Sequence, residues 1–586
     1  MAEDDPLSLK DRGFRAEKEG RDEEALAFYD RAAVLYRAAW ESQTTPVLRE
    51  SQGTSLAIAL QHGVTLEIRR RQWDAAARRL EETLSVWRSV AGGAGPTASL
   101  LGTRAMVQRA QGHLPEAWAS ITEALATAEA AHVAETWPLH GMAGRLARAR
   151  GDATGAEAAF RQAITNVETL RGRLTTDETK IAFFGTPADL YEEFVAFLMD
   201  TQRPEAALEI AEKARARALL DGVGGAGSEG EGFAGETPSP ASAPTVSAAD
   251  ALALARARDT AFLVYFLTRA KLYVWLLTPQ GRVYSGAQVA DPASVAQAVQ
   301  ALREPLVFGE SFEAPRRALN DLLTGPVAAA LDALPPASRL SIVPHKILAQ
   351  VPFAMLGPTP GAWAEAWSLT VLPSLSVGAQ RSARPLPPDG PLLAVGYSTA
   401  HRPLPAVAGE LKAAAALYPG ATVLSEADAT ASRLRAELPH YPLILIAAHS
   451  ARRPGAPGDV GQGEPLEIVL SGSALTSRDL KPGLTPRAGL VILSACETLQ
   501  GVQVAGDELL NLARAFLIAG AERVLLTQWE VEDAATATLV PALLAGVREG
   551  QSPAWALHNA VQAYRLAHAN DGSAAWAAWI LVGPHD

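Results

Sequence analysis

The second half of the chain alternates short apolar, β-prone segments with segments of helical character. This alternation predicts a mainly parallel sheet with helices on both faces, because each crossover between parallel strands needs a helix-length connection. Strands buried on both faces are continuous apolar runs, as these segments are. We expect strands at 261–267, 272–277, 340–343, 392–395, 421–424, 443–448, 490–494 and 523–528, the first two as a hairpin. We expect helices near 291–303, 313–333, 406–418, 429–438, 506–519, 533–547 and 553–568.

Two of the expected strands end beside a reactive side chain. His449 directly follows the strand 443–448, and Cys496, the one cysteine of the chain, follows the strand 490–494 closely. In open α/β sheets, functional groups collect at the carboxyl ends of the strands. A thiol and an imidazole at one sheet edge are what a cysteine nucleophile and its acid/base partner require. The alternative is a buried cysteine and a buried histidine with structural roles only.

Residues 1–221 are predicted to form an all-α domain with a degenerate internal repeat. Ala, Leu, Glu and Arg dominate, and a turn is repeatedly followed by two alanines seven residues apart. These pairs are Ala25 and Ala32, Ala117 and Ala124, and Ala156 and Ala163, with weaker copies at 71–76 and 202–207. The pattern resembles the tetratricopeptide repeat, although its anchors are spaced more widely than the usual ~34 residues. A generic Ala-rich bundle is the alternative, whereas a repeat array would offer a groove for a peptide or protein partner.

Residues 222–249 are rich in glycine, serine and proline and predict a flexible, protease-accessible linker. The glycines are not followed by the Lys-Ser/Thr ending of a phosphate loop. We therefore expect a second domain at 250–586, with an N-terminal half at about 250–385 and a catalytic half at about 386–586.

Composition excludes several classes of protein. The net charge of −12 and the pI of about 5.5 argue against a nucleic-acid binder. No apolar run approaches the ~18–20 residues that cross a bilayer, and the acidic start is unlike a signal peptide. A single cysteine excludes an intrachain disulfide framework and cysteine-rich zinc sites. We expect a cytoplasmic protein with no membrane, metal or cofactor.

Several segments around the candidate residues resemble the CHAT family, caspase-like domains found attached to tetratricopeptide repeats. The segment Leu-Ser-Ala-Cys-Glu-Thr at 493–498 is the most specific of them. Caspases also place their histidine about 50 residues before the cysteine, close to the spacing found here. The other matching segments are 211–221, 342–353, 372–376, 506–524, 527–533 and 574–583.

The resemblance implies a cysteine endopeptidase regulated through its helical repeats. Cys496 would be the nucleophile, and His449 would protonate the leaving amine and assist deacylation. Relatives in the family act in bacterial defence, some of them on gasdermin-like pore formers, so a protein substrate and a protein or ligand activator at the repeats are expected. The alternative is a catalytically silent interaction scaffold.

The resemblance also implies an oxyanion hole and a substrate pocket. The hole would use the backbone N–H groups of Ser450 and Cys496, where the family often has glycine in place of Ser450. By analogy with separases, acids beside the catalytic edge would favour a basic P1 residue. The expected pocket residues are Asp507, Trp529, Glu530, Glu532 and Asp533. The alternative is that these acids serve only the N-terminus of a helix.

Overall fold

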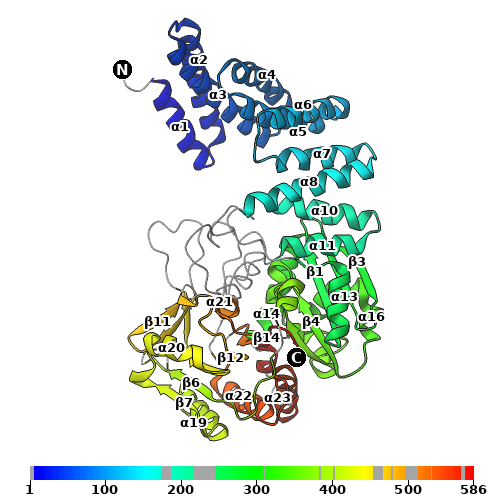
Figure 1. The fold of residues 1–586 in the computed structure, drawn as a ribbon, viewed down its shortest axis with the longest axis vertical. Helices are drawn as coiled ribbons and strands as arrows, with labels where there is room; N and C mark the ends of the chain where they lie inside the picture. The colour runs from blue at the N-terminus through cyan, green and yellow to red at the C-terminus, as the bar shows by residue number, and fades with distance from the viewer. Residues whose placement is uncertain are drawn as a thin grey trace, which may run out of the picture. The chain divides into compact units, whose positions relative to one another are not determined.

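The structure is a computed structural model of the full chain. It describes residues 5–172, 187–215, 245–308, 311–381, 384–399, 401, 403–452, 466–476, 479–494, 512–529, 531–568 and 574–585. The chain divides into two compact units, Met1–Arg173 and Leu174–Asp586, which we call the repeat unit and the sheet unit (Figure 1). The two units are considered separately.

The repeat unit is helical throughout its described residues. Its helices are α1 (Pro6–Lys18), α2 (Asp22–Ser42), α3 (Pro46–Arg69), α4 (Trp73–Ser89), α5 (Ala94–Ala110), α6 (Leu114–Ala130), α7 (Trp137–Ala149) and α8 (Ala153–Arg171). Consecutive helices pack against each other, and all six repeat alanines are fully buried. Small side chains at these positions let two helices approach closely, as the repeat pattern predicted.

The turns between paired helices explain the residue that opens each repeat. Gly20, Gly112 and Gly151 have positive φ angles of 73°, 85° and 78°, a backbone conformation that glycine adopts without strain. The two weaker copies place Arg71 and Gln202 at the same point of the turn, with φ angles of 58° and 59°. All five copies therefore share one turn geometry. The last copy joins α10 (Ala188–Asp200) to α11 (Pro204–Ala214), which belong to the sheet unit.

The sheet unit is built on a mixed, mainly parallel sheet of eleven strands among its described residues, and the predicted fold class is confirmed. The strand order is β3-β2-β1-β4-β5-β14-β13-β12-β8-β6-β7. Described neighbours are antiparallel where β1 meets β2, β2 meets β3 and β13 meets β14, and parallel elsewhere. The strands are β1 (Thr260–Leu267), β2 (Lys271–Leu277), β3 (Val283–Val289), β4 (Ser338–Val343), β5 (Trp367–Val371), β6 (Leu392–Tyr397), β7 (Thr422–Ser425), β8 (Leu443–Ala448), β12 (Leu490–Leu493), β13 (Val524–Thr527) and β14 (Trp579–Val582).

All eight predicted strands are present, the first two as the predicted hairpin. Sequence analysis missed β3, β5, β14 and a small second sheet of β9 (Ser450–Arg452), β10 (Leu466–Leu470) and β11 (Ser473–Thr476). The remaining helices are α13 (Ala248–Ala257), α14 (Pro292–Phe308), α15 (Glu313–Thr324), α16 (Ala328–Asp332), α17 (Ala362–Ala366), α18 (Leu375–Gln380), α19 (Val407–Leu417), α20 (Ala431–Glu437), α21 (Leu512–Ala519), α22 (Asp533–Arg548) and α23 (Pro553–Ala567).

The helical segment predicted at 313–333 is present but interrupted. Residues 313–333 do not form a continuous helix, because α15 ends at Thr324 and a 3₁₀ turn, Gly325–Val327, precedes α16. Pro326 follows Gly325 at this interruption, and a proline that lacks a backbone N–H after a flexible glycine favours a break in the helix. Of the helix predicted at 506–519, only α21 lies within the described residues.

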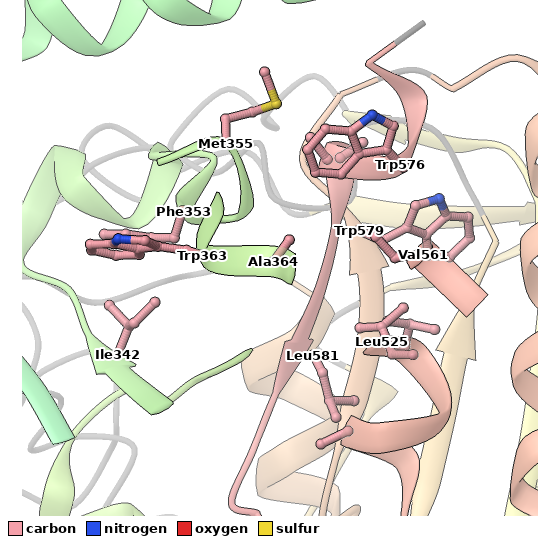
Figure 2. Packing of buried hydrophobic residues seen from close by; sticks show 14 of the residues in the cluster. Ile342, Phe353, Met355, Trp363, Ala364, Leu525, Val561, Trp576, Trp579 and Leu581 are labelled. Atoms are coloured by element: carbon pink, nitrogen blue, oxygen red, sulfur yellow. The ribbon is translucent and has the colours of Figure 1, made fainter. Parts of the chain in front are cut away.

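Alternate residues of each central strand enter two separate cores. In β8, Leu445 lies in one apolar cluster and Ile444 in the other, and both are fully buried. The first cluster includes residues of α14, α15, α19, α22 and α23, and the second includes residues of α20 and α21. Figure 2 shows part of the first cluster, where Phe353 and Trp363 lie on one side and Trp579 and Leu581 on the other. Burial on both faces explains the continuous apolar runs in the sequence.

Helix α11 and the residue that follows it are anchored to the sheet by buried polar contacts. The carboxylate of Glu212 accepts hydrogen bonds from the backbone N–H and the hydroxyl of Ser376, at 3.0 and 3.1 Å. The fully buried guanidinium of Arg215 donates to the carbonyls of Pro344, at 2.9 Å, and Tyr265. Burial raises the pKa of Glu212, opposed by the charge of Arg215 and the hydrogen bonds from Ser376. The second helix of this last pair is therefore built into the sheet unit.

Arginine side chains lie at the edge of the sheet where the parallel strands begin, opposite the carboxyl edge. Arg523 donates to the carbonyl of Pro584 at 2.9 Å, and Arg339 donates to the carbonyl of Arg258 at 3.0 Å. His585, which follows Pro584, is 1% exposed. The guanidinium groups thus donate hydrogen bonds to backbone carbonyls at strand ends. A buried carbonyl without a donor would be costly.

Candidate functional site

The predicted His449 follows β8 at the carboxyl edge of the sheet. Its side chain is only 4% exposed, and its carbonyl accepts a hydrogen bond of 2.8 Å from the N–H of Val469 in β10. Its backbone is therefore fixed from two sides, by β8 before it and by the small sheet after it. A buried imidazole on a rigid strand end has the fixed position that proton transfer requires.

The neighbouring strand β12 runs parallel to β8, as expected for the strand that precedes Cys496. Leu490 pairs with Leu443, and Leu493 pairs with Ile446. The N–H of Ser494 still donates to the carbonyl of Ile446, at 2.9 Å, so the pairing extends to Ser494. Cys496 itself lies outside the described residues.

Ser450, the predicted oxyanion-hole residue, is a strand residue. It opens β9 and is paired with Ile468 of β10 in an antiparallel arrangement. It is not among the described residues with positive φ, so serine adopts this backbone without left-handed strain. Serine therefore carries no backbone penalty at this position.

Trp529 follows the end of β13 and belongs to the core. It is 4% exposed and lies within the first apolar cluster. The preceding residue, Gln528, is fully buried and donates to the carbonyls of Ala349 and Val351, at 3.3 and 3.1 Å. The backbone carbonyl of Gln528 accepts a hydrogen bond of 2.6 Å from the guanidinium of Arg303. The end of β13 is thus tied to the half of the sheet unit that precedes residue 386.

The predicted acidic cluster lies at the start of α22. Glu532 is exposed and is the N-cap residue, but its side chain makes no capping hydrogen bond. Asp533 is the first residue of the helix. Both positions suit an acid next to the positive end of a helix dipole, so this alternative stays open. Glu530 and Asp507 lie outside the described residues.

Sequence analysis missed Glu410. It lies in the first turn of α19, which packs on β6 and β8, and its side chain is buried, with 2% exposed. The Oγ of Ser494 donates to Glu410 Oε2 at 3.1 Å. A signal existed, because Glu410 falls on the helical stripe formed by Val407, Leu411 and Ala414, which predicts burial.

A second histidine, His345, follows the carboxyl end of β4. Its contacts indicate a structural role. Burial, followed by the nearby charges of Arg215 and Lys346, holds its pKa well below the usual range. Its Nδ1 accepts a hydrogen bond of 2.8 Å from the N–H of Leu267, and its ring stacks on Phe266 at 4.2 Å. This imidazole is neutral and packed in place.

Comparison with known proteins agrees with the predicted family. Residues 313–584 match the family model described as "CHAT domain". Among curated proteins, "Tetratricopeptide repeat protein 28" of Mus musculus is 34% identical over 119 residues, which cover 20% of this chain and 5% of that protein. The predicted combination of helical repeats and a CHAT domain is confirmed.

Two solved structures are among the matches. The "Saccharomyces cerevisiae separase-securin complex" matches 99% of this chain and 53% of that chain, with 9% identity and a TM-score of 0.46. "BtubC (BKLC) from P. vanneervenii" matches 40% of this chain and 85% of that chain, with 16% identity and a TM-score of 0.28. Across the part of the chain that the structure describes, no helix is both long and apolar enough to cross a bilayer.

Proposed function

We propose that this protein is a cysteine endopeptidase with a His449–Cys496 dyad. The match of residues 313–584 to the CHAT domain family supports a caspase-like protease. A protein is the proposed substrate. No metal or cofactor is needed for this reaction, since the thiol and the imidazole supply the nucleophile and the proton.

The register of β8 and β12 is the observation that carries the proposal. The two strands are parallel neighbours, and Leu443 is level with Leu490. His449 follows Leu443 by six residues, and Cys496 follows Leu490 by the same interval. Equal spacing from a shared register point is what a dyad at one sheet edge requires.

In the proposed reaction, Cys496 Sγ attacks the scissile carbonyl carbon as a thiolate. A thiol pKa near 8.5 leaves a minority of thiolate at neutral pH, so the imidazole of His449 assists by taking the proton. The imidazolium then protonates the leaving amine as the C–N bond breaks and a thioester forms. Water, deprotonated by His449, hydrolyses the thioester and restores the free thiol.

The surrounding residues have proposed roles in binding. The N–H groups of Ser450 and Cys496 would stabilise the oxyanion, and the extended backbone of Ser450 in β9 is compatible with that role. Glu530, Glu532, Asp533, Asp507 and Trp529 would form or support a pocket for a basic P1 residue. The exposure of Glu532 leaves its carboxylate accessible to such a side chain.

The repeat unit is the proposed regulatory part. Its helical pairs share one turn geometry, the arrangement of arrays that bind peptides or proteins along their length. We propose that a protein or ligand activator binds there and controls cleavage by the sheet unit. A role in bacterial defence or cell death, with a gasdermin-like substrate, is the proposed biological setting.

Paired substitutions test the dyad. Cys496→Ala and His449→Ala should each reduce cleavage of a peptide library by at least ~10²–10⁴-fold, because each residue acts in bond breaking. His440→Ala is the matched control, since His440 is exposed at the end of the 3₁₀ turn Leu438–His440, which precedes β8. Thermal melting would verify that the variants fold. Cleavage by the Cys496→Ala protein at the wild-type rate would refute the proposal.

A peptide carrying a thiol-reactive group separates the protease from a silent scaffold. An active dyad should label Cys496 rapidly, and His449→Ala should slow the labelling. A scaffold would label at the rate of an ordinary thiol in both proteins.

A further inference from the structure

Two buried polar side chains meet where β12 ends. Ser494 is 9% exposed and Glu410 is 2% exposed, although they are 84 residues apart in the chain. The Ser494 hydroxyl donates to the Glu410 carboxylate at 3.1 Å. Burying a carboxylate is costly unless hydrogen bonds compensate it, so this contact has a structural or functional purpose.

The helix dipole does not account for Glu410. An acid in the first turn of a helix interacts favourably with the dipole while it stays exposed to water. Glu410 instead lies on the apolar stripe of α19, which packs on β6 and β8, and its carboxylate bonds to a different element. The dipole would be served equally well by an acid on the outer face of α19, without the cost of burial.

The contact fixes the end of β12 on a second side. The N–H of Ser494 donates to Ile446 in β8, and its hydroxyl donates to Glu410 in α19. Ser494 therefore cannot shift along or away from the sheet without breaking one of two bonds. Cys496 follows two residues later in the sequence.

We infer that Glu410 is a positioning residue, which holds the end of β12 through Ser494 and thereby sets the thiol of Cys496 relative to His449. This inference rests on the proposed dyad. The reason is geometric: misplacing a reacting group by about 1 Å costs on the order of 10²-fold in rate.

The single cysteine of the chain makes the inference testable without a substrate. Iodoacetamide can alkylate only Cys496, so the alkylation rate reports on that thiol directly. The rate would be measured for Glu410→Ala, Ser494→Ala, the double variant and Glu410→Gln, together with kcat and KM for peptide cleavage. Glu549→Gln and Ser432→Ala are matched controls, because both residues are exposed on the sheet unit.

We expect each alanine variant to slow alkylation and to lower kcat by about 10- to 100-fold with little change in KM, since positioning acts on the reacting group. The double variant should lose no more than the stronger single variant, because the two residues act through one contact. Glu410→Gln should retain most activity, since its amide oxygen can still accept the bond from Ser494. The controls should match the wild type.

Independent, additive effects of the two alanine substitutions would overturn the inference, as would unchanged alkylation in Ser494→Ala. Should Glu410→Ala fail to fold, Ser494→Ala and Glu410→Gln still decide the matter, because they change only a hydroxyl and a charge. Failure of the proposed function is recognised separately. In that case the wild type would cleave no peptide, whereas the alkylation rates would still reveal the coupling.

Discussion

His585 should make the sheet unit sensitive to acid, and the effect can be calculated. The residue is 1% exposed at the amino edge of the sheet. Burial, assisted by the charges of Arg339, Arg523 and Arg258, lowers its pKa to about 3. In the unfolded chain its pKa returns to about 6.5.

The sign follows from proton linkage. Between pH 6.5 and 3 the unfolded chain binds a proton at His585 that the folded protein does not bind. The free energy of unfolding therefore falls as the pH drops below about 6.5, by about 1.4 kcal/mol for each pH unit. At pH 4.5 the loss from His585 alone is about 2.7 kcal/mol, a large part of a typical stability of ~5–15 kcal/mol.

The assay is urea unfolding of the full chain at pH 7.5 and pH 4.5, followed by tryptophan fluorescence. His585→Gln cannot titrate, so its loss of stability between the two pH values should be smaller than that of the wild type by about 2.7 kcal/mol. Any packing defect from glutamine affects both pH values and cancels in the difference. His345, whose pKa is also lowered by burial, contributes in both proteins and cancels too.

His440→Gln, at an exposed histidine, is the control for replacing a histidine by glutamine. Equal losses in the wild type and in His585→Gln, to within about 0.5 kcal/mol, would refute the reasoning, because a buried neutral histidine must produce the difference. Such a result would mean that His585 is hydrated or charged in the folded protein.

Three further results are expected. Proteolytic cutting within 222–248 should leave both products together in gel filtration, because Glu212 and Arg215 of the first product are buried against the second; separate elution would contradict this. Asp533→Lys should depress cleavage after arginine more than it affects folding, and a wild-type preference for aspartate or a large apolar residue at P1 would assign the acids to the start of α22. Gln528→Leu should lower the stability of the sheet unit by roughly 1–3 kcal/mol, since two buried carbonyls lose their donor, and an unchanged urea midpoint would count against it.

The central strands could be predicted because burial on both faces leaves a continuous apolar run, as in β8 and β12. Two of the missed strands, β3 and β5, lack this signature. β3 is an edge strand with partly exposed residues, and β5 contains Ser368 and Thr370. β14 is a buried apolar run like β12, but it directly follows the apolar 3₁₀ turn Ala575–Ala578, so the sequence does not mark where the strand begins. Tertiary pairing, rather than local preference, makes these segments strands.

Some features of the candidate site depend on neighbouring residues in the sequence, and others depend on residues far away in the sequence. The place of His449 is a local property, because it ends an apolar run. The contact between Ser494 and Glu410 joins two segments that only the strand order brings together, and the pattern of either segment alone does not specify it. Periodicity can indicate that Glu410 is buried, but it cannot name its partner.

The anchoring of α11 bears on how a signal from the repeats could reach the site. The stretch 216–244, which lies outside the described residues, runs from Arg215, buried against β1 and the end of β4, to residue 245. The next residue, Val246, donates its N–H to Ser376, which also donates to Glu212. Both ends of this stretch are therefore fixed within the sheet unit, so its length does not set the distance between the two units. Within the sheet unit, α11 contacts the sheet through the buried Glu212 and, directly after the helix, Arg215, so we expect a signal carried along the chain to act on these contacts.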